Sequence, residues 1–164
     1  MRQDVRSGAM PAVETPLRVR YSETDRMGIV YHGNYIVWFE IGRTEYCRAA
    51  GMPYRAMEDA GVLILVTSVA CTYRRSARYD DPITVRARMT ELTSRGCAFG
   101  YEILGADGEV LADGSTRHVF ADAAGRPRRA PEEFLRPLAA FRESAAGTPE
   151  AGPDIHSQTT GGWR

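Results

Sequence analysis

The chain has 164 residues, of which 43% are hydrophobic and 26% charged, a balance typical of one globular domain that buries a core. Its formal net charge is zero, which excludes a general nucleic-acid binder that depends on neutralising phosphates. No segment carries the roughly 18 to 20 consecutive apolar residues that a membrane span needs. Because the first residues lead into no apolar signal segment, we expect a cytoplasmic protein.

Residue usage excludes further kinds of chemistry. All 21 basic residues are arginine, which we interpret as biased composition, so the chain has no lysine nucleophile, Schiff base or P-loop lysine. The three cysteines and three histidines are scattered, without the paired spacing of zinc ligands. We therefore expect no metal, no cofactor and reduced, mostly buried thiols.

The first half of the chain predicts an arm, a strand and a long helix. Residues 1–15 have the mixed composition of a flexible arm. Residues 17–21 alternate apolar and charged side chains, the two-residue period of a half-buried strand. From Asn34 to Ala50, apolar residues recur at spacings of three and four, which predicts a helix. Its apolar surface is wider than one stripe, so we expect this helix to be covered on more than one side.

The second half of the chain reads mainly as strands. β-Branched residues and two-residue alternation predict strands at residues 62–73, 83–90, 99–103 and 110–120. Tight turns rich in Asp, Gly and Pro join these four strands, which indicates an antiparallel meander. Short helices are expected at 53–60 and 131–142, and a disordered tail at 143–164. Residues 16–142 thus form one α+β domain, a five-stranded antiparallel sheet wrapped around a central helix.

The clearest motif lies between the first strand and the long helix. Asp25 stands three residues before Gly28, and the loop then runs through Asn34 and Tyr35 into the helix. This combination of residues, order and spacing closely resembles the signature of the 4-hydroxybenzoyl-CoA thioesterase-like family of acyl-CoA thioesterases. The resemblance covers about residues 17–138 and implies the hotdog fold. A single hotdog unit leaves its sheet edges uncovered, so we expect a homodimer or homotetramer.

The chemistry of thioester hydrolysis explains why an acid would stand at this place. The reaction needs a nucleophile or an activated water, and donors for the oxyanion that develops on the carbonyl. A carboxylate in a loop before a helix lies near unpaired N–H groups and the positive end of the helix dipole, which keep it ionised. Asp25 lies nine residues before Asn34, too far for a helix cap, which we expect at Asn34 or Gly33 instead. We therefore predict that Asp25 is catalytic.

The resemblance implies roles for further residues. The backbone N–H of His32 would donate to the oxyanion, with Tyr31 beside it, while the His32 ring could either polarise the carbonyl or only pack. Glu23 is expected to be solvated, because it alternates with Tyr21 at a strand end. The expected substrate contacts are Gly28, Val30, Asn34, Tyr35 and Trp38. Guanidinium groups suit the phosphates of coenzyme A, and the candidates are Arg75, Arg78 and Arg128.

These expectations define a thioesterase that releases a free acid and a thiol from an acyl- or aroyl-CoA, or from an acyl-carrier protein. Whether Asp25 attacks the carbonyl carbon or activates a water stays open. A hotdog hydratase or dehydratase and a non-catalytic acyl-CoA binding module are the alternatives. A hydrolase of the serine type is excluded, because the chain has no Gly-x-Ser-x-Gly elbow.

Overall fold

The computed structural model describes residues 10–144. In chain order the elements are β1 (Val13–Arg18), the 3-10 turn η1 (Tyr21–Glu23), α1 (Gly33–Ala49), α2 (Tyr54–Asp59), β2 (Leu63–Tyr73), β3 (Pro82–Leu92), β4 (Gly96–Leu104), β5 (Val110–Ala121) and α3 (Glu132–Glu143). Most of the expected arm and tail lies outside the described residues.

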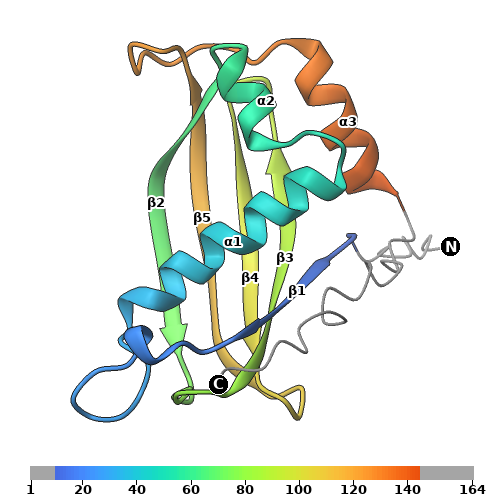
Figure 1. The fold of residues 1–164 in the computed structure, drawn as a ribbon. Coiled ribbons are helices and arrows are strands. Elements are labelled where there is room, and N and C mark those ends of the chain that lie inside the picture. Colours follow the sequence, from blue (N-terminus) through green and yellow to red (C-terminus); the bar gives the residue numbers. More distant parts are fainter. Residues whose placement is uncertain (1–9, 145–164) are drawn as a thin grey trace, which may run out of the picture.

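The five strands form one antiparallel sheet in the order β1-β3-β4-β5-β2 (Figure 1). β3, β4 and β5 follow one another as hairpins, and β1 and β2 are the two edges. β2 pairs with β5 and not with β3, so the predicted meander is correct for β3–β5 and wrong for β2. Helix α1 crosses one face of this sheet (Figure 1). The prediction of a five-stranded antiparallel sheet around a central helix is confirmed.

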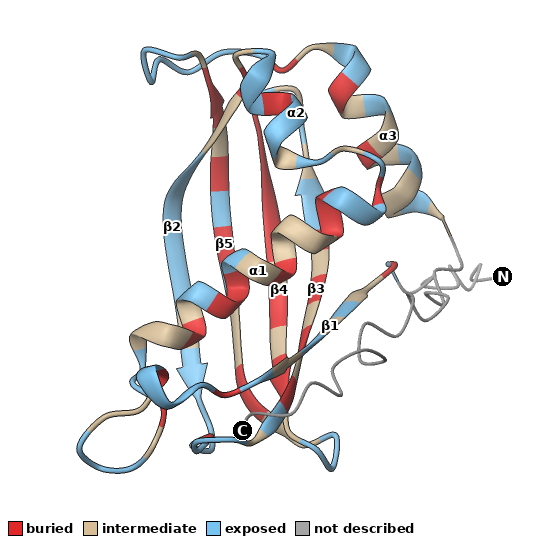
Figure 2. Ribbon diagram, viewed as in Figure 1, coloured by how far each residue is buried: buried red, intermediate tan, exposed pale blue. Residues whose placement is uncertain are grey.

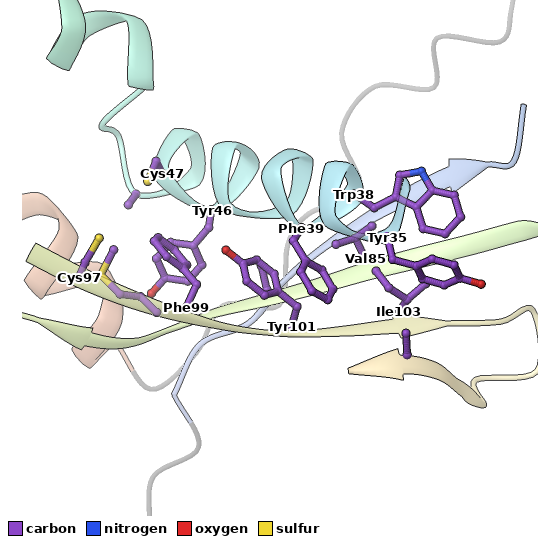
Figure 3. Packing of buried hydrophobic residues seen from close by; sticks show 14 of the residues in the cluster. Tyr35, Trp38, Phe39, Tyr46, Cys47, Val85, Cys97, Phe99, Tyr101 and Ile103 are labelled. Carbon is purple, nitrogen blue, oxygen red and sulfur yellow. The ribbon is translucent and has the colours of Figure 1, made fainter. Parts of the chain in front are cut away.

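The core lies between α1 and the sheet. Figure 3 shows Phe39 and Tyr46 of α1 pointing toward the sheet, where Phe39 stacks on Tyr101 of β4 with ring centroids 4.4 Å apart. Full burial of one such side chain contributes about 1.5–3 kcal/mol. Gly42 allows the close approach of the helix, because a Cβ there would lie 2.6 Å from Cγ1 of Val85. The contacts of this face therefore fix where α1 begins, and with it the loop that precedes it.

Helices α2 and α3 close the end of the sheet opposite that loop (Figure 1). Met57 of α2 and Leu138 of α3 are both 1% exposed, and Phe141 packs edge-to-face on Tyr46 of α1. The outer side of α1 is open in the single chain, where Val37 is 45% exposed. No helix within residues 10–144 is both long enough and apolar enough to cross a membrane.

The first strand differs from its predicted bounds. β1 begins at Val13, three residues before the expected domain start, because Val13 pairs with Ala87 of β3. It ends at Arg18, and the chain then turns into η1 instead of extending the strand to Tyr21. The other elements agree with the predicted ranges to within a few residues.

The two sheet edges are unlike each other. β1 has six residues, and its Pro16 has no N–H to offer another strand. β2 has eleven residues, and Figure 2 shows it mostly as exposed, in contrast to the buried β4. Val66, Val69 and Tyr73 expose 43–46% of their surface. A long, apolar, exposed edge of this kind is suited to pairing with another strand.

Candidate active site

A short closed loop presents Asp25. An isolated β-bridge between Thr24 and Val30 closes its base. Within the loop, the N–H of Asp25 donates to the Ile29 carbonyl (2.9 Å), and the N–H of Gly28 donates to the Asp25 carbonyl (3.0 Å). Gly28 has φ +72°, a left-handed conformation that glycine adopts without strain. The motif spacing between Asp25 and Gly28 is therefore that of a tight turn.

The carboxylate of Asp25 is held at one oxygen. Its Oδ1 accepts the backbone N–H of Met27 at 2.8 Å. Among residues 10–144, the carboxylate has no other hydrogen-bond partner, and Asp25 is partly exposed. One oxygen is thus oriented by the loop, and the other is available to a substrate carbonyl or to a water.

Glu23 is buried, so the prediction that it is solvated is wrong. The side chain is 5% exposed; its Oε2 accepts the Arg20 N–H (2.7 Å), and its Oε1 accepts the indole N–H of Trp38 (3.1 Å). Burial on its own would raise the pKa of Glu23, but the hydrogen bonds from Arg20 and Trp38 outweigh it and lower this pKa. The strand alternation ends at η1, and the turn directs Glu23 inward.

The backbone of Glu23 also joins the loop to α1. Its carbonyl accepts the N–H of Tyr31 (2.9 Å) and the side-chain amide of Asn34 (2.8 Å). Through this hydrogen bond, Asn34 links the start of α1 to η1, and it is not the expected N-cap. Nor is Gly33 the cap: His32 occupies the N-cap position and makes no side-chain cap bond.

The start of α1 leaves two backbone donors open. In local turns, the N–H of Asn34 donates to the Tyr31 carbonyl (2.9 Å), and the N–H of Tyr35 donates to the His32 carbonyl (3.3 Å). Within the described part of the chain, the N–H groups of His32 and Gly33 have no hydrogen-bond partner. Both lie at the positive end of a 17-residue helix. Open backbone donors therefore lie at Gly33 and at His32, the residue for which the resemblance implies an oxyanion contact.

The side chains of Tyr31 and His32 are exposed beside these donors. Their rings lie 4.4 Å apart, and the Tyr31 ring covers Gly33 so closely that a Cβ there would lie 2.7 Å from its Cε1. The absence of a side chain at Gly33 lets the Tyr31 ring lie against the backbone. Tyr31 thus forms a wall next to the open amides.

Three of the predicted substrate contacts lie in the core. Val30, Tyr35 and Trp38 are 3%, 2% and 1% exposed. The Tyr35 hydroxyl accepts the N–H of Ala77 (3.1 Å), and Trp38 donates to Glu23. Their burial gives these residues packing roles that fix the loop, in place of the predicted contact with substrate. The apolar spacing of α1 in the sequence does not show whether one of its side chains lines a substrate pocket or packs in the core.

The structure brings only some of the predicted arginines to this loop. Arg78 is exposed and donates to the Gly28 carbonyl at 3.3 Å, and Arg75 pairs with Glu109 at 2.6 Å. Arg128 contacts the Gly61 carbonyl just before β2 (3.4 Å), at the opposite end of the sheet from Asp25 (Figure 1). Within one chain, Arg128 and Asp25 are therefore not neighbours.

Sequence reasoning missed Tyr73, the last residue of β2. Its hydroxyl donates to the His32 carbonyl at 2.9 Å. The available signal was topological, because β2 ends beside the start of α1 (Figure 1) and the side chain of its last residue bonds to the His32 carbonyl. Without the strand order, this neighbour could not be identified.

This chain combines three features of hotdog-fold thioester hydrolases: an acid in a loop, open amides at the start of the central helix, and an antiparallel sheet around that helix. The sequence profile of the Thioesterase-like superfamily matches residues 19–138. The chain belongs to this family, and the resemblance found in the Asp25 motif is confirmed.

Individual relatives agree with this assignment. YneP of Bacillus subtilis (strain 168), provisionally named as an acyl-CoA thioesterase, is 36% identical over 106 residues, which are 65% of this chain and 77% of YneP. The acyl-CoA thioester hydrolase YbgC of Escherichia coli O6:H1 is 28% identical over 73% of this chain and 90% of its own. A crystal structure of DHNA-CoA thioesterase from Staphylococcus aureus superposes with a TM-score of 0.75 and 29% identity, covering 79% of this chain and 89% of that one.

Proposed function

We propose that the protein hydrolyses the thioester of an acyl- or aroyl-CoA to a free acid and coenzyme A, with Asp25 as the catalytic carboxylate. The observation that carries the proposal is that the short segment between η1 and α1 holds both a carboxylate with one free oxygen and two open helix amides. The names of YneP, YbgC and the Staphylococcus aureus enzyme support the substrate class.

Asp25 can act in either of two ways. As a general base it takes a proton from a water, whose oxygen attacks the thioester carbon; as a nucleophile it attacks that carbon itself and forms an anhydride that water then hydrolyses. In both routes the C–S bond breaks, the sulfur takes a proton, and one water is consumed per thioester. The Met27 N–H on Oδ1 orients the carboxylate in both.

The amides of His32 and Gly33 are the proposed oxyanion donors. When the carbonyl carbon becomes tetrahedral, its oxygen gains negative charge, and preorganised N–H groups stabilise that charge more than they stabilise the ground state. The positive end of α1 adds to this stabilisation. Loss of one such donor typically lowers kcat about a hundredfold to a thousandfold.

A homodimer through β2 is part of the proposal. The exposed apolar side chains on this edge, Val66, Val69 and Tyr73, need a cover that the described part of the chain does not provide. The other edge is short and carries Pro16. Antiparallel pairing of two β2 strands about a two-fold axis would extend the sheet and bury these residues.

Such a dimer would also reconcile the position of Arg128 with its predicted role. Two antiparallel β2 strands place the beginning of one beside the end of the other. Arg128 contacts Gly61 just before β2, and the Asp25 loop lies near the end of β2. The Arg128 of a second copy would then approach Arg75 and Arg78, and the three guanidinium groups could together bind the phosphates of coenzyme A.

The carrier of the acyl group and the compartment are further parts of the proposal. The same thioester chemistry serves an acyl-carrier protein, and the exposed arginines near the loop could receive its acidic surface. The three cysteines are all free thiols, which fits a reducing compartment such as the cytoplasm.

The function is tested by measuring thiol release from a panel of aroyl-, short-acyl- and long-acyl-CoA thioesters and from the matching acyl-carrier proteins. The proposal predicts enzyme-dependent release of free thiol from at least one CoA thioester. Release from carrier-protein thioesters alone would revise the carrier but not the chemistry.

The alternatives give different results in the same assay. A hydratase acting on an enoyl-CoA would lower the enoyl absorbance without releasing thiol. A binding module would shift the melting temperature on addition of acyl-CoA and would leave every thioester intact. Either outcome would overturn the proposed hydrolysis.

A further inference from the structure

Tyr73 is held in a defined position at the end of β2. Its ring packs edge-to-face against Tyr35, with centroids 5.2 Å apart, and against the His32 ring at 6.1 Å. Tyr35 is itself fixed in the core by its bond with the N–H of Ala77. The hydroxyl of Tyr73 therefore reaches the start of α1 from a rigid support.

This hydroxyl donates a hydrogen bond to the carbonyl of His32 at 2.9 Å, and the Cys71 thiol lies beside it. Burial, with nearby Cys71 adding to it, raises the pKa of Tyr73 to about 12, so the hydroxyl keeps its proton at neutral pH and stays a donor. The contact is thus a hydrogen bond from Tyr73 to the first carbonyl of the helix.

That carbonyl belongs to the same peptide unit as the N–H of Gly33. In a trans peptide the C=O and N–H bonds point in opposite directions, so the orientation of one fixes the other. The Gly33 N–H has no partner within residues 10–144, so this peptide is held through its carbonyl, which accepts the Tyr73 hydroxyl at 2.9 Å and the Tyr35 N–H at a longer 3.3 Å. A hydrogen bond accepted by the carbonyl also polarises the peptide and makes its N–H a stronger donor.

We propose that Tyr73 is a positioning residue for the oxyanion donors: its hydroxyl fixes and polarises the peptide between His32 and Gly33, so that the Gly33 N–H points out of the helix toward the thioester oxygen. The inference rests on the proposed hydrolysis and adds a residue on another strand to its machinery. It also places the Gly33 amide, beside that of His32, among the donors.

The substitution Tyr73→Phe tests this role, because it removes the hydroxyl and keeps the ring that packs on Tyr35. An oxyanion donor acts mainly in the transition state, so kcat should fall about tenfold to a hundredfold while KM changes less than about twofold. The matched control is Tyr79→Phe, since Tyr79 is 58% exposed and its hydroxyl bonds to nothing in the described region. This control should keep the wild-type kcat.

A second measurement separates positioning from general damage. In the nitrogen–proton NMR spectrum, Tyr73→Phe should shift the Gly33 amide resonance, whereas Tyr79→Phe should not. Light scattering and the melting temperature verify that both variants keep the assembly and the fold.

The outcomes distinguish this inference from the function on which it rests. If the wild type releases no thiol, the proposed hydrolysis fails first. If the wild type is active and Tyr73→Phe keeps its kcat within twofold, or raises KM alone, the positioning role is overturned. An unshifted Gly33 amide in the variant would overturn it as well.

Discussion

Glu23 is the residue that joins the Asp25 loop to the core. Its carboxylate holds Arg20 and Trp38, and its carbonyl holds Tyr31 and Asn34. The loop thus starts from a point fixed on both sides, although it is itself exposed. The position of Asp25 depends on this anchor more than on any contact of Asp25 itself.

Replacing Glu23 by Gln should lower the free energy of unfolding at pH 7 by about 1–3 kcal/mol, because the amide cannot accept both the Arg20 and the Trp38 N–H groups as the carboxylate does. The folded-state pKa of Glu23 lies below its ordinary value of 4.5. Its contribution is therefore present above pH 4.5 and is lost as the pH falls through the folded pKa. Chemical denaturation at pH 7 and pH 3 should find a difference between wild type and variant that narrows in acid.

The exposed Glu58 provides the control, since its carboxylate makes no hydrogen bond or ion pair with another side chain of the described region. Equal stability of wild type and Glu23→Gln at pH 7 would contradict the anchoring role.

At this scale the loop position of Asp25 before α1 was predictable, because it follows from local order along the chain, and the family resemblance pointed to the amide of His32. The sequence did not predict the burial of Glu23 or the contribution of Tyr73. Both depend on where a distant element lies: Trp38 is 15 residues from Glu23, and Tyr73 is 41 residues from His32.

Among the elements, β4 and β5 carry a buried polar chain beneath α1. The hydroxyls of Tyr101 and Thr116 lie 2.7 Å apart, and Thr116 lies 2.7 Å from Nε2 of His118. Nδ1 of His118 is buried and has no partner among the described residues. Burial, followed by the nearby charge of Arg43, lowers the pKa of His118 to about 4.

The low pKa of His118 predicts a dependence of stability on pH. The unfolded chain binds this proton from about pH 6.5 downward, whereas the folded chain resists it until about pH 4, so stability is lost as the pH falls through this window. Between pH 7 and pH 5 the loss from His118 should be on the order of 2 kcal/mol. In His118→Gln, denaturation midpoints should fall less over the same interval.

If wild type and His118→Gln lose the same stability between pH 7 and pH 5, the histidine is not buried in its neutral form.

Most element types and bounds were predictable from the sequence, because strands with two-residue alternation and a helix with a broad apolar face leave clear patterns. The end of β1 was not, since Glu23 bends the chain through a contact with α1.

On the scale of the whole molecule, the central question is what covers β2. A substitution that places a charge on this edge, Val69→Glu, should separate the proposed dimer, because two like charges would meet near the two-fold axis. Light scattering should give a mass of at least twice the 18.2 kDa chain for the wild type, and a smaller mass for the variant.

Thr90→Glu is the matched control, because Thr90 is exposed on a central strand and not on the β2 edge. A wild type that stays a single chain at micromolar concentration would contradict the proposed edge pairing. So would a Val69→Glu variant that keeps the full assembly. Either result would also remove the basis for a contribution of Arg128 from a second copy, which depends on pairing through β2.

The most direct test of the catalytic account is thiol release by Asp25→Asn beside the wild type, on the CoA thioester that the wild type cleaves best. The amide can accept the Met27 N–H but can neither attack the thioester nor take a proton, so kcat should fall by at least about a hundredfold with the fold and the assembly unchanged. A variant that releases thiol at nearly the wild-type rate would contradict the assignment of Asp25 as the catalytic carboxylate.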